Sequence, residues 1–280
     1  MSRINELFTF SVKRKDLDWE RIIRCQECKY SNKRCFKVRK SQSDISIGTC
    51  TVQYGKENKP VIICPNRLLE RKQIFIDCLH LLNSHTPGNE LHLVPEVSIP
   101  GGSVDYFLAS TDSNRKVKDF VGIELQTMDT TGTVWPEREK ALVELGINSS
   151  STVEKTYGMN WKMTAKTILV QLHHKIETFE AINKHLVLIV QDCLLNYIQK
   201  EFDFEHVSSH PLMGDSMHFH SYKLRDDGVN YKLILDNRYS TDSNGISKLL
   251  GLHANANVGL EEIVGFLESK ISDSTVFTIG

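Results

Sequence analysis

Apolar positions in the middle of the chain recur with two different periods. They alternate with polar positions in residues 91–99, 104–109 and 120–126, which predicts three strands joined by turns. They recur at helical spacing over residues 161–182, and an unbroken apolar run follows at 185–190. The second pattern predicts a long helix that leads into a buried strand. A helix between strands indicates an α/β core.

Three further segments have weaker patterns. Apolar residues close to helical spacing predict one amphipathic helix over residues 67–82. Short alternating stretches predict more strands between residues 203 and 240, and residues 259–270 are expected to form a closing helix.

The composition is that of an ordinary globular protein. The chain has 280 residues, of which 40% are hydrophobic and 25% are charged, so a disordered or fibrous chain is excluded. No apolar run approaches the roughly 20 residues that cross a bilayer. The N-terminus has no apolar signal core, and we expect a cytoplasmic protein without a membrane partner.

Charge and cysteine are both concentrated near the N-terminus. Residues 13–40 carry eleven Lys and Arg against four Asp and Glu, a balance of +7, so the rest of the chain is at −8. This segment is either a solvated basic face or a surface that binds phosphates. Five of the seven cysteines fall within residues 25–64, and in a reducing compartment such clustering favours a metal over disulfides. We therefore expect a small metal-stabilised module over residues 1–66, followed by a core over residues 67–280.

Two acidic residues in the predicted strands suggest chemistry. Glu124 and Gln126 share one strand face because side chains alternate along a strand, and Asp105 lies on the strand before. Glu124 lies in an apolar strand, so its carboxylate needs a cation, a metal or a set of donors. A Mg²⁺ ion held by Asp105 and Glu124 would meet that need and would suit phosphodiester hydrolysis.

These residues resemble the PD-(D/E)xK nuclease motif, with Gln126 in the usual Lys position. More narrowly, the chain resembles the NotI family of type II restriction endonucleases. The residues that carry this resemblance are Cys28 and Cys35, 47–50, 63–67, 94–97, 101–106 and 122–132, with looser likeness at 161–163 and 186–192.

The resemblance implies a restriction-endonuclease-like core, a mixed central sheet flanked by helices, with DNA-recognition elements toward the C-terminus. It implies a Mg²⁺-dependent enzyme that cuts double-stranded DNA at a fixed sequence, usually as a homodimer. Asp105 and Glu124 would hold the metal, Gln126 would position the attacking water, and Glu96 is a possible third acidic contributor. A partner DNA methyltransferase is expected by analogy with restriction systems in bacterial or archaeal cells.

The resemblance also implies an N-terminal four-cysteine metal site. The matched ligands are Cys28, Cys35, Cys50 and Cys64, although the spacing of Cys25 and Cys28 would also allow Cys25 to replace Cys35. Four thiolates suit Zn²⁺ or a single iron and leave no open position for substrate, so the role would be structural.

Three alternatives stay open at this point. The chain could be a non-catalytic DNA-binding protein with a metal finger, or a repair or recombination nuclease of the same fold. Asp215, His218 and His220, with His210 nearby, could bind a metal, although surface or hydrogen-bonding histidines are the expectation that we favour.

Overall fold

The computed structural model describes residues 2–148 and 157–252, with Val264 and Ser269. Apart from those two residues, the predicted helix over 259–270 lies outside the described residues. Within the part of the chain that is described, no helix combines the length and the apolar character needed to cross a membrane.

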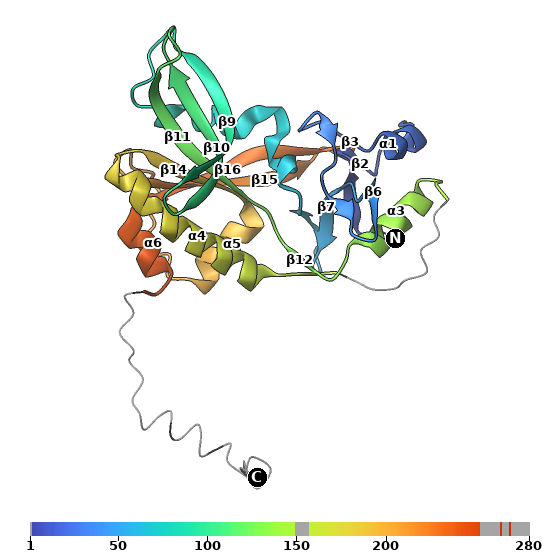
Figure 1. The fold of residues 1–280 in the computed structure, drawn as a ribbon. Helices are drawn as coiled ribbons and strands as arrows, with labels where there is room; N and C mark the ends of the chain where they lie inside the picture. Colours follow the sequence, from blue (N-terminus) through green and yellow to red (C-terminus); the bar gives the residue numbers. More distant parts are fainter. Residues whose placement is uncertain (1, 149–156, 253–263, 265–268, 270–280) are drawn as a thin grey trace, which may run out of the picture.

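A six-stranded mixed sheet forms the centre of the molecule (Figure 1). Its strand order is β16-β15-β14-β11-β10-β9. The middle strands β11, β14 and β15 run parallel, and antiparallel pairs extend the sheet on both sides. The expected α/β architecture is confirmed, as are the three predicted strands and the buried strand after them. The bounds are β9 Glu90–Ile99, β10 Gly102–Thr111, β11 Val117–Gln126, β14 His185–Gln191, β15 Met217–Asp226 and β16 Tyr231–Thr241.

Helical segments cover both faces of this sheet. On one face, α4 leads into β14, α5 connects β14 to β15, and α6 packs beside α4. The other face is covered by three short helical turns, and each face has its own hydrophobic cluster. The predicted long helix is confirmed as α4. The bounds are α4 Trp161–Ala181, α5 Asp192–Glu201, α6 Ser243–Leu249, η1 Pro65–Lys72, α2 Gln73–Ile76 and η2 Leu79–Leu81.

The single helix expected over residues 67–82 is wrong, because the segment forms η1, α2 and η2 instead. Arg71 and Lys72 take left-handed backbone angles, with φ of 53° and 56°, which interrupt any continuous helix. The fully buried Arg67 guanidinium bonds Glu6 at 2.7 Å and Glu70 at 2.8 Å. These tertiary contacts fix the turn and override the local spacing of apolar residues.

The N-terminal part forms a second, four-stranded sheet of order β2-β1-β7-β8. Its buried residues, among them Leu7 and Val52, belong to the same hydrophobic cluster as the inner side of α4. Helix α3, which the apolar pattern did not reveal, packs on this sheet, and the side chain of Arg138 reaches the carbonyl of Ile47 at 2.7 Å. A division of the chain after residue 66 stays a prediction. The bounds are β1 Ile4–Leu7, β2 Phe10–Ser11, β7 Thr49–Tyr54, β8 Lys59–Ile62, α1 Trp19–Cys25 and α3 Trp135–Glu144; minor strands are β3 Glu27–Cys28, β4 Lys33–Arg34, β5 Val38–Arg39, β6 Gln42–Ser46, β12 Thr130–Thr131 and β13 Gly158–Met159.

Two glycines let α4 lie close to the sheet. A Cβ atom at Gly122 on β11 would lie 2.4 Å from the ring of Phe179, and one at Gly101 would lie 2.0 Å from the carbonyl oxygen of His174. Gly101 also has a φ of 94°, which disfavours other residues in the turn between β9 and β10. The close approach of α4 to this turn and to β11 sets the depth of the site described next.

Candidate active site

Asp105 and Glu124 come from neighbouring antiparallel strands. The register that pairs Tyr106 of β10 with Ile123 of β11 continues to place Asp105 beside Glu124. One carboxylate oxygen of Asp105 accepts a hydrogen bond from the backbone N–H of Leu125 at 2.8 Å. The structure therefore brings together the two residues that the sequence singled out.

Lys175 of α4 completes this group. Its ammonium lies 2.7 Å from Glu124 Oε1, and both side chains are buried. The buried carboxylate was expected to need a cation, a metal or donors, and within the described residues a lysine meets that need. Gly122 lies two residues before Glu124, on the same face of β11, and α4 packs closely over it. This close packing brings Lys175 near the Glu124 carboxylate.

Burial dominates the electrostatics of both acids. Burial raises the pKa of Glu124 to about 7, with a further rise from Asp105, although the Lys175 ammonium acts in the opposite direction. Burial also raises the pKa of Asp105, against the hydrogen bond from Leu125 and the charge of Lys175, and Glu96 adds to the rise. The site can therefore hold or release a proton close to neutral pH.

Gln126 and Glu96 lie at the edge of the group. Gln126 is half-buried, and its Nε2 donates to the carbonyl of Thr127 at 2.6 Å. Glu96 is exposed on β9 with a φ of 52°, and it is close enough to Asp105 to raise the pKa of that acid. Gln126 thus borders a cavity with Asp105 and Glu124, and Glu96 borders a second cavity with Asp105.

Two open cavities meet at Asp105. The first, of about 440 Å³, is bordered by Asp105, Glu124, Gln126 and Lys175, together with the Gly101–Gly102 turn and Gln171. The second, of about 300 Å³, lies between β9 and the N-terminal part and is bordered by Glu96, Phe36, Asn66 and Tyr106. A substrate group in either cavity would reach the carboxylate of Asp105.

The four cysteines matched to the metal site lie near one another. Cys28, Cys50 and Cys64 are buried, Cys35 is half-buried, and Cys25 is exposed. The Cys50 thiol lies 3.5 Å from the carbonyl oxygen of Gly48, and it is close enough to Cys64 to shift the pKa of that thiol. Burial is the main cause that raises the pKa of Cys35, and the nearby Cys64 and Cys28 add to the rise.

Cys64 is the most acidic thiol of this group. The hydrogen bond from Cys50 is the main cause that lowers the pKa of Cys64 to about 6, and Lys37 and the N–H groups of Asn66 and Arg67 contribute. Among the described residues, however, no three His, Cys, Asp or Glu side chains are arranged to hold a metal ion. The four-cysteine metal centre therefore stays a prediction.

The expectation of surface or hydrogen-bonding histidines is confirmed at the surface for His210, which is exposed, whereas His218 and His220 of β15 are buried. The expectation of hydrogen bonding is confirmed for His218, whose Nε2 lies 3.0 Å from the carbonyl of Asp215 and 3.3 Å from His185 Nδ1. His220 stacks on His80 with ring centres 5.9 Å apart. The Nδ1 atom of His220 lies 3.8 Å from the Cys78 thiol, so both of these partners come from the segment around η2.

Lys175 is the residue of this site that the motif analysis missed. The motif places its third position two residues after Glu124, whereas Lys175 lies 51 residues later in the chain. Its signal is in the helix pattern: Lys175 lies three residues after Leu172 and four before Phe179, on the buried stripe of α4. A charged residue at a stripe position indicates a buried partner.

Comparisons with known proteins give little support beyond this geometry. No protein-family model matches the chain, and no curated protein matches it. Among solved structures, that of Pyrococcus furiosus SfsA in complex with Ca²⁺ is similar over 69% of this chain and 71% of that chain, with 9% sequence identity and a TM-score of 0.32. A TM-score this low supports no inference about function. The likeness to the NotI family therefore rests on the sequence motifs alone.

Proposed function

We propose that the protein is a Mg²⁺-dependent endonuclease that cuts double-stranded DNA at a fixed sequence, as type II restriction endonucleases do. One observation carries the proposal: Asp105 and Glu124, from adjacent strands, border the same open cavity as Gln126 and the buried Lys175. An acidic pair can hold the metal ion for phosphodiester hydrolysis, and the amide and the cation beside it can orient a water molecule and a phosphate.

The donor set fits a Mg²⁺ ion. Asp105 Oδ1 and Glu124 Oε2 make no hydrogen bond to another described residue, so one oxygen of each carboxylate can serve as a ligand. Mg²⁺ usually binds through one or two carboxylates and takes the rest of its shell from water and phosphate. When bound, the ion would supply an activated water and stabilise charge on the phosphate.

The protein's own residues would hold and orient the reacting groups. Gln126 uses its Nε2 on Thr127, which leaves Oε1 to accept a hydrogen bond from a water molecule. Gln126 cannot act as a general base. Lys175 would keep the Glu124 carboxylate oriented and would place a positive charge beside a bound phosphate.

The basic N-terminal part would contribute to DNA binding. Lys33, Arg34 and Lys40 are exposed there, near the cysteine group. Contacts of such side chains with phosphates position DNA without reading its sequence. We further propose a homodimer on a palindromic site, a structural Zn²⁺ or iron ion on the four cysteines, and a cognate methyltransferase.

A DNA digest tests the proposal. Purified protein is incubated with unmethylated phage DNA in Mg²⁺ or in EDTA, and the products are separated on a gel. Discrete bands that require Mg²⁺ are expected from the wild type, and loss of cleavage with binding retained is expected from Asp105→Ala and Glu124→Ala. Glu57→Ala, at an exposed glutamate paired with Lys59, is the matched control and should cut normally. Full activity in either site variant would refute the assignment.

A second candidate is a DNA-binding protein without catalysis. The observation in its favour is that Lys175 already neutralises Glu124, so the buried carboxylate does not require a metal. In the same experiment this function would give a shifted DNA band without cleavage. Its salt dependence would still be steep, because phosphate contacts release counterions.

A further inference from the structure

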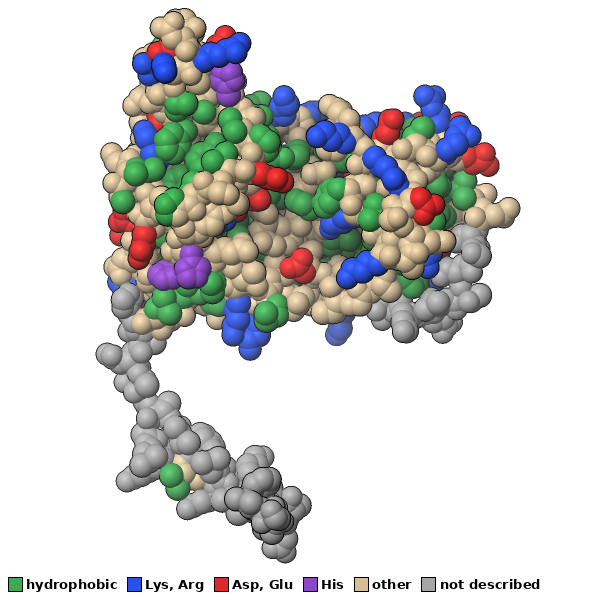
Figure 2. All heavy atoms as spheres, in the orientation of Figure 1, with side chains coloured by type: hydrophobic (Ala, Val, Ile, Leu, Met, Phe, Trp, Pro, Cys, Tyr) green, Lys and Arg blue, Asp and Glu red, His purple; other side chains and the backbone are tan. Residues whose placement is uncertain are grey.

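Helix α4 covers only part of the sheet face that carries Asp105 and Glu124. On β11 the helix contacts the strand at Glu124 through Lys175 and at Gly122 through Phe179. The ends of β9, β10 and β11 that lie beyond Phe179 extend past the end of α4, and hydrophobic side chains gather on them (Figures 1 and 2). The other end of the same face is therefore without a covering helix among the described residues.

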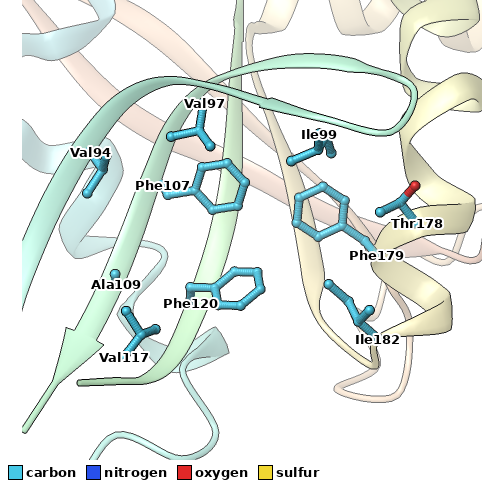
Figure 3. A pocket seen from close by; sticks show the side chains of 10 residues that line it. All are labelled: Val94, Val97, Ile99, Phe107, Ala109, Val117, Phe120, Thr178, Phe179 and Ile182. Atoms are coloured by element: carbon cyan, nitrogen blue, oxygen red, sulfur yellow. The ribbon is translucent and has the colours of Figure 1, made fainter.

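This uncovered part of the face is a groove of about 450 Å³ (Figure 3). Phe107 and Phe120 of the strands point toward Phe179 of the helix, and Thr178 is the one polar residue among its lining side chains. The rim is well exposed to solvent, at 59% for Val117 and 50% for Ile182. An exposed concave surface of this kind indicates a binding surface for an apolar ridge.

The sequence that follows residue 252 contains apolar positions that could form such a ridge. Residues 253–280 contain apolar positions at Leu260, Ile263, Val264, Leu267 and Ile271, which is the i, i+3, i+4, i+7, i+11 spacing of one helix face. The positions between them hold three glutamates, a lysine, a glycine, a serine and Phe266. A helix with one apolar side is the shape that enters an apolar groove.

The end of α6 lies within reach of the groove. The N–H of Ser243 bonds the Glu180 carboxylate, and the Ser247 hydroxyl lies 3.4 Å from His173 Nδ1, so α6 runs opposite to α4. Ser247 is therefore about two and a half turns of α4 away from Ile182, roughly 13 Å along the helix, and α6 continues only to Leu249. Residues 253–258 can span roughly 20 Å when extended, which is enough to bring residue 260 to the groove.

We propose that residues 259–271 form an amphipathic helix that docks into this groove of the same chain. The apolar side of that helix covers Phe107, Phe120 and Val117 and continues the layer that α4 begins. A second copy of the chain is the weaker candidate, because two concave grooves do not fill each other. This inference does not depend on the nuclease function.

Photocrosslinking tests the docked segment. p-Benzoylphenylalanine is placed at Ile182 in the full-length protein, the sample is irradiated, and the products are identified by mass spectrometry. The expected product is a monomer in which position 182 is joined to a peptide from residues 258–271. Val170 is the control position, because it is also exposed on α4, at 42%, but does not border the groove. A covalent dimer, or no product from Ile182 above that from Val170, would overturn the proposal.

A variant of the proposed helix provides a second test. Leu267→Asp places a charge on its apolar side and should reduce the crosslink at Ile182 at least fivefold, whereas Glu262→Gln, on the opposite side, should leave it unchanged. Both changes lie in the terminal segment and outside the sheet core, so circular dichroism should be close to wild type for both. Equal crosslinking in the two variants would contradict docking through the apolar side.

Discussion

The ammonium of Lys175 lies 2.7 Å from a carboxylate oxygen of Glu124, and both side chains are buried. The pair joins the middle of α4 to the central strand β11 at the candidate active site. It depends on the helix lying close to the sheet, which Gly101 and Gly122 permit. Helix packing and the chemistry of the site are thus properties of the same contact.

Lys175→Met should destabilise the fold, because Glu124 would then be buried without a cation. The expected loss in free energy of unfolding is about 3 kcal/mol, the lower end for a broken buried pair. The lower end applies because burial raises the pKa of Glu124 to about 7 even beside Lys175, and the carboxylate can take up a proton when the lysine is removed. Chemical denaturation would measure this loss, which should be larger at pH 8 than at pH 6. The double variant with Glu124→Gln should recover part of it.

The control for this prediction is Lys166→Met, an exposed lysine on the same helix. It should change stability by less than about 0.5 kcal/mol. Equal stability of the two lysine variants would contradict a structural role for the ion pair.

Gly101→Ala should be more damaging than Gly88→Ala, although both glycines have nearly the same backbone angle. Their φ values are 94° and 97°, so both substitutions carry a backbone penalty of about 1–2 kcal/mol. An added Cβ meets nothing within 4 Å at Gly88, but at Gly101 it lies 2.0 Å from the His174 carbonyl oxygen. The clash should add about 1–3 kcal/mol.

The two glycine variants can be compared by thermal and urea unfolding. Gly101→Ala should also weaken the site, because displacement of α4 separates Lys175 from Glu124. If Gly101→Ala and Gly88→Ala lower the free energy of unfolding equally, α4 can move away from residue 101 at no cost. The close approach of Gly101 to His174 would then contribute nothing to stability.

The sequence predicts the strands and α4 well because their apolar side chains are buried in regular arrays. Strand alternation also places Glu124 and Gln126 on one face, whereas the pairing of Asp105 with Glu124 and the contact of that face with α4 come from the structure. The region 67–82 fails because its conformation is set by the contact of Arg67 with Glu6, which is distant in sequence. Lys175 was missed for the same reason: its partner is on another element, and a local motif cannot contain it.

His218 should make stability depend on pH. Burial is the main cause that lowers the pKa of His218 from 6.5 to about 4, with contributions from His185, His80 and Arg238 and an opposing one from the carbonyl of Asp215. In the unfolded chain His218 binds a proton more readily than in the folded protein. The contribution of His218 to the free energy of unfolding is therefore fully present above about pH 6.5 and is lost as the pH falls toward 4. At pH 5 the loss should be about 2 kcal/mol.

Urea unfolding at pH 7 and pH 5 would detect this effect. His218→Gln should lose less stability between the two pH values than wild type, whereas His210→Gln, at an exposed loop position, should behave as wild type. The raised pKa of Glu124 has the opposite effect, because the contribution of Glu124 to the free energy of unfolding is lost as the pH rises toward 7. The variants at His218 and His210 are therefore best compared in a Glu124→Gln background. An identical pH dependence with and without His218 would refute the prediction.

The cysteine group should hold one metal ion if all four matched thiols are ligands. Cys64→Ser and Cys50→Ser should then lose the metal, and the loss should lower the free energy of unfolding because metal binding contributes to folding. The acidic Cys64 thiol, with its pKa lowered to about 6 by the hydrogen bond from Cys50, is the ligand that deprotonates most easily. Elemental analysis of the purified protein would measure the metal content.

Cys25 decides between the two possible ligand sets. It is exposed, whereas Cys35 is half-buried and interacts with Cys28 and Cys64, so Cys25→Ser should retain the metal and Cys35→Ser should lose it. The two variants remove the same chemical group from the same part of the chain, so they are matched controls for each other. Loss of the metal in Cys25→Ser alone would assign Cys25 in place of Cys35. Unchanged metal content in Cys50→Ser and Cys64→Ser would exclude the four-cysteine centre, and the hydrogen bond between those two thiols would then serve packing alone.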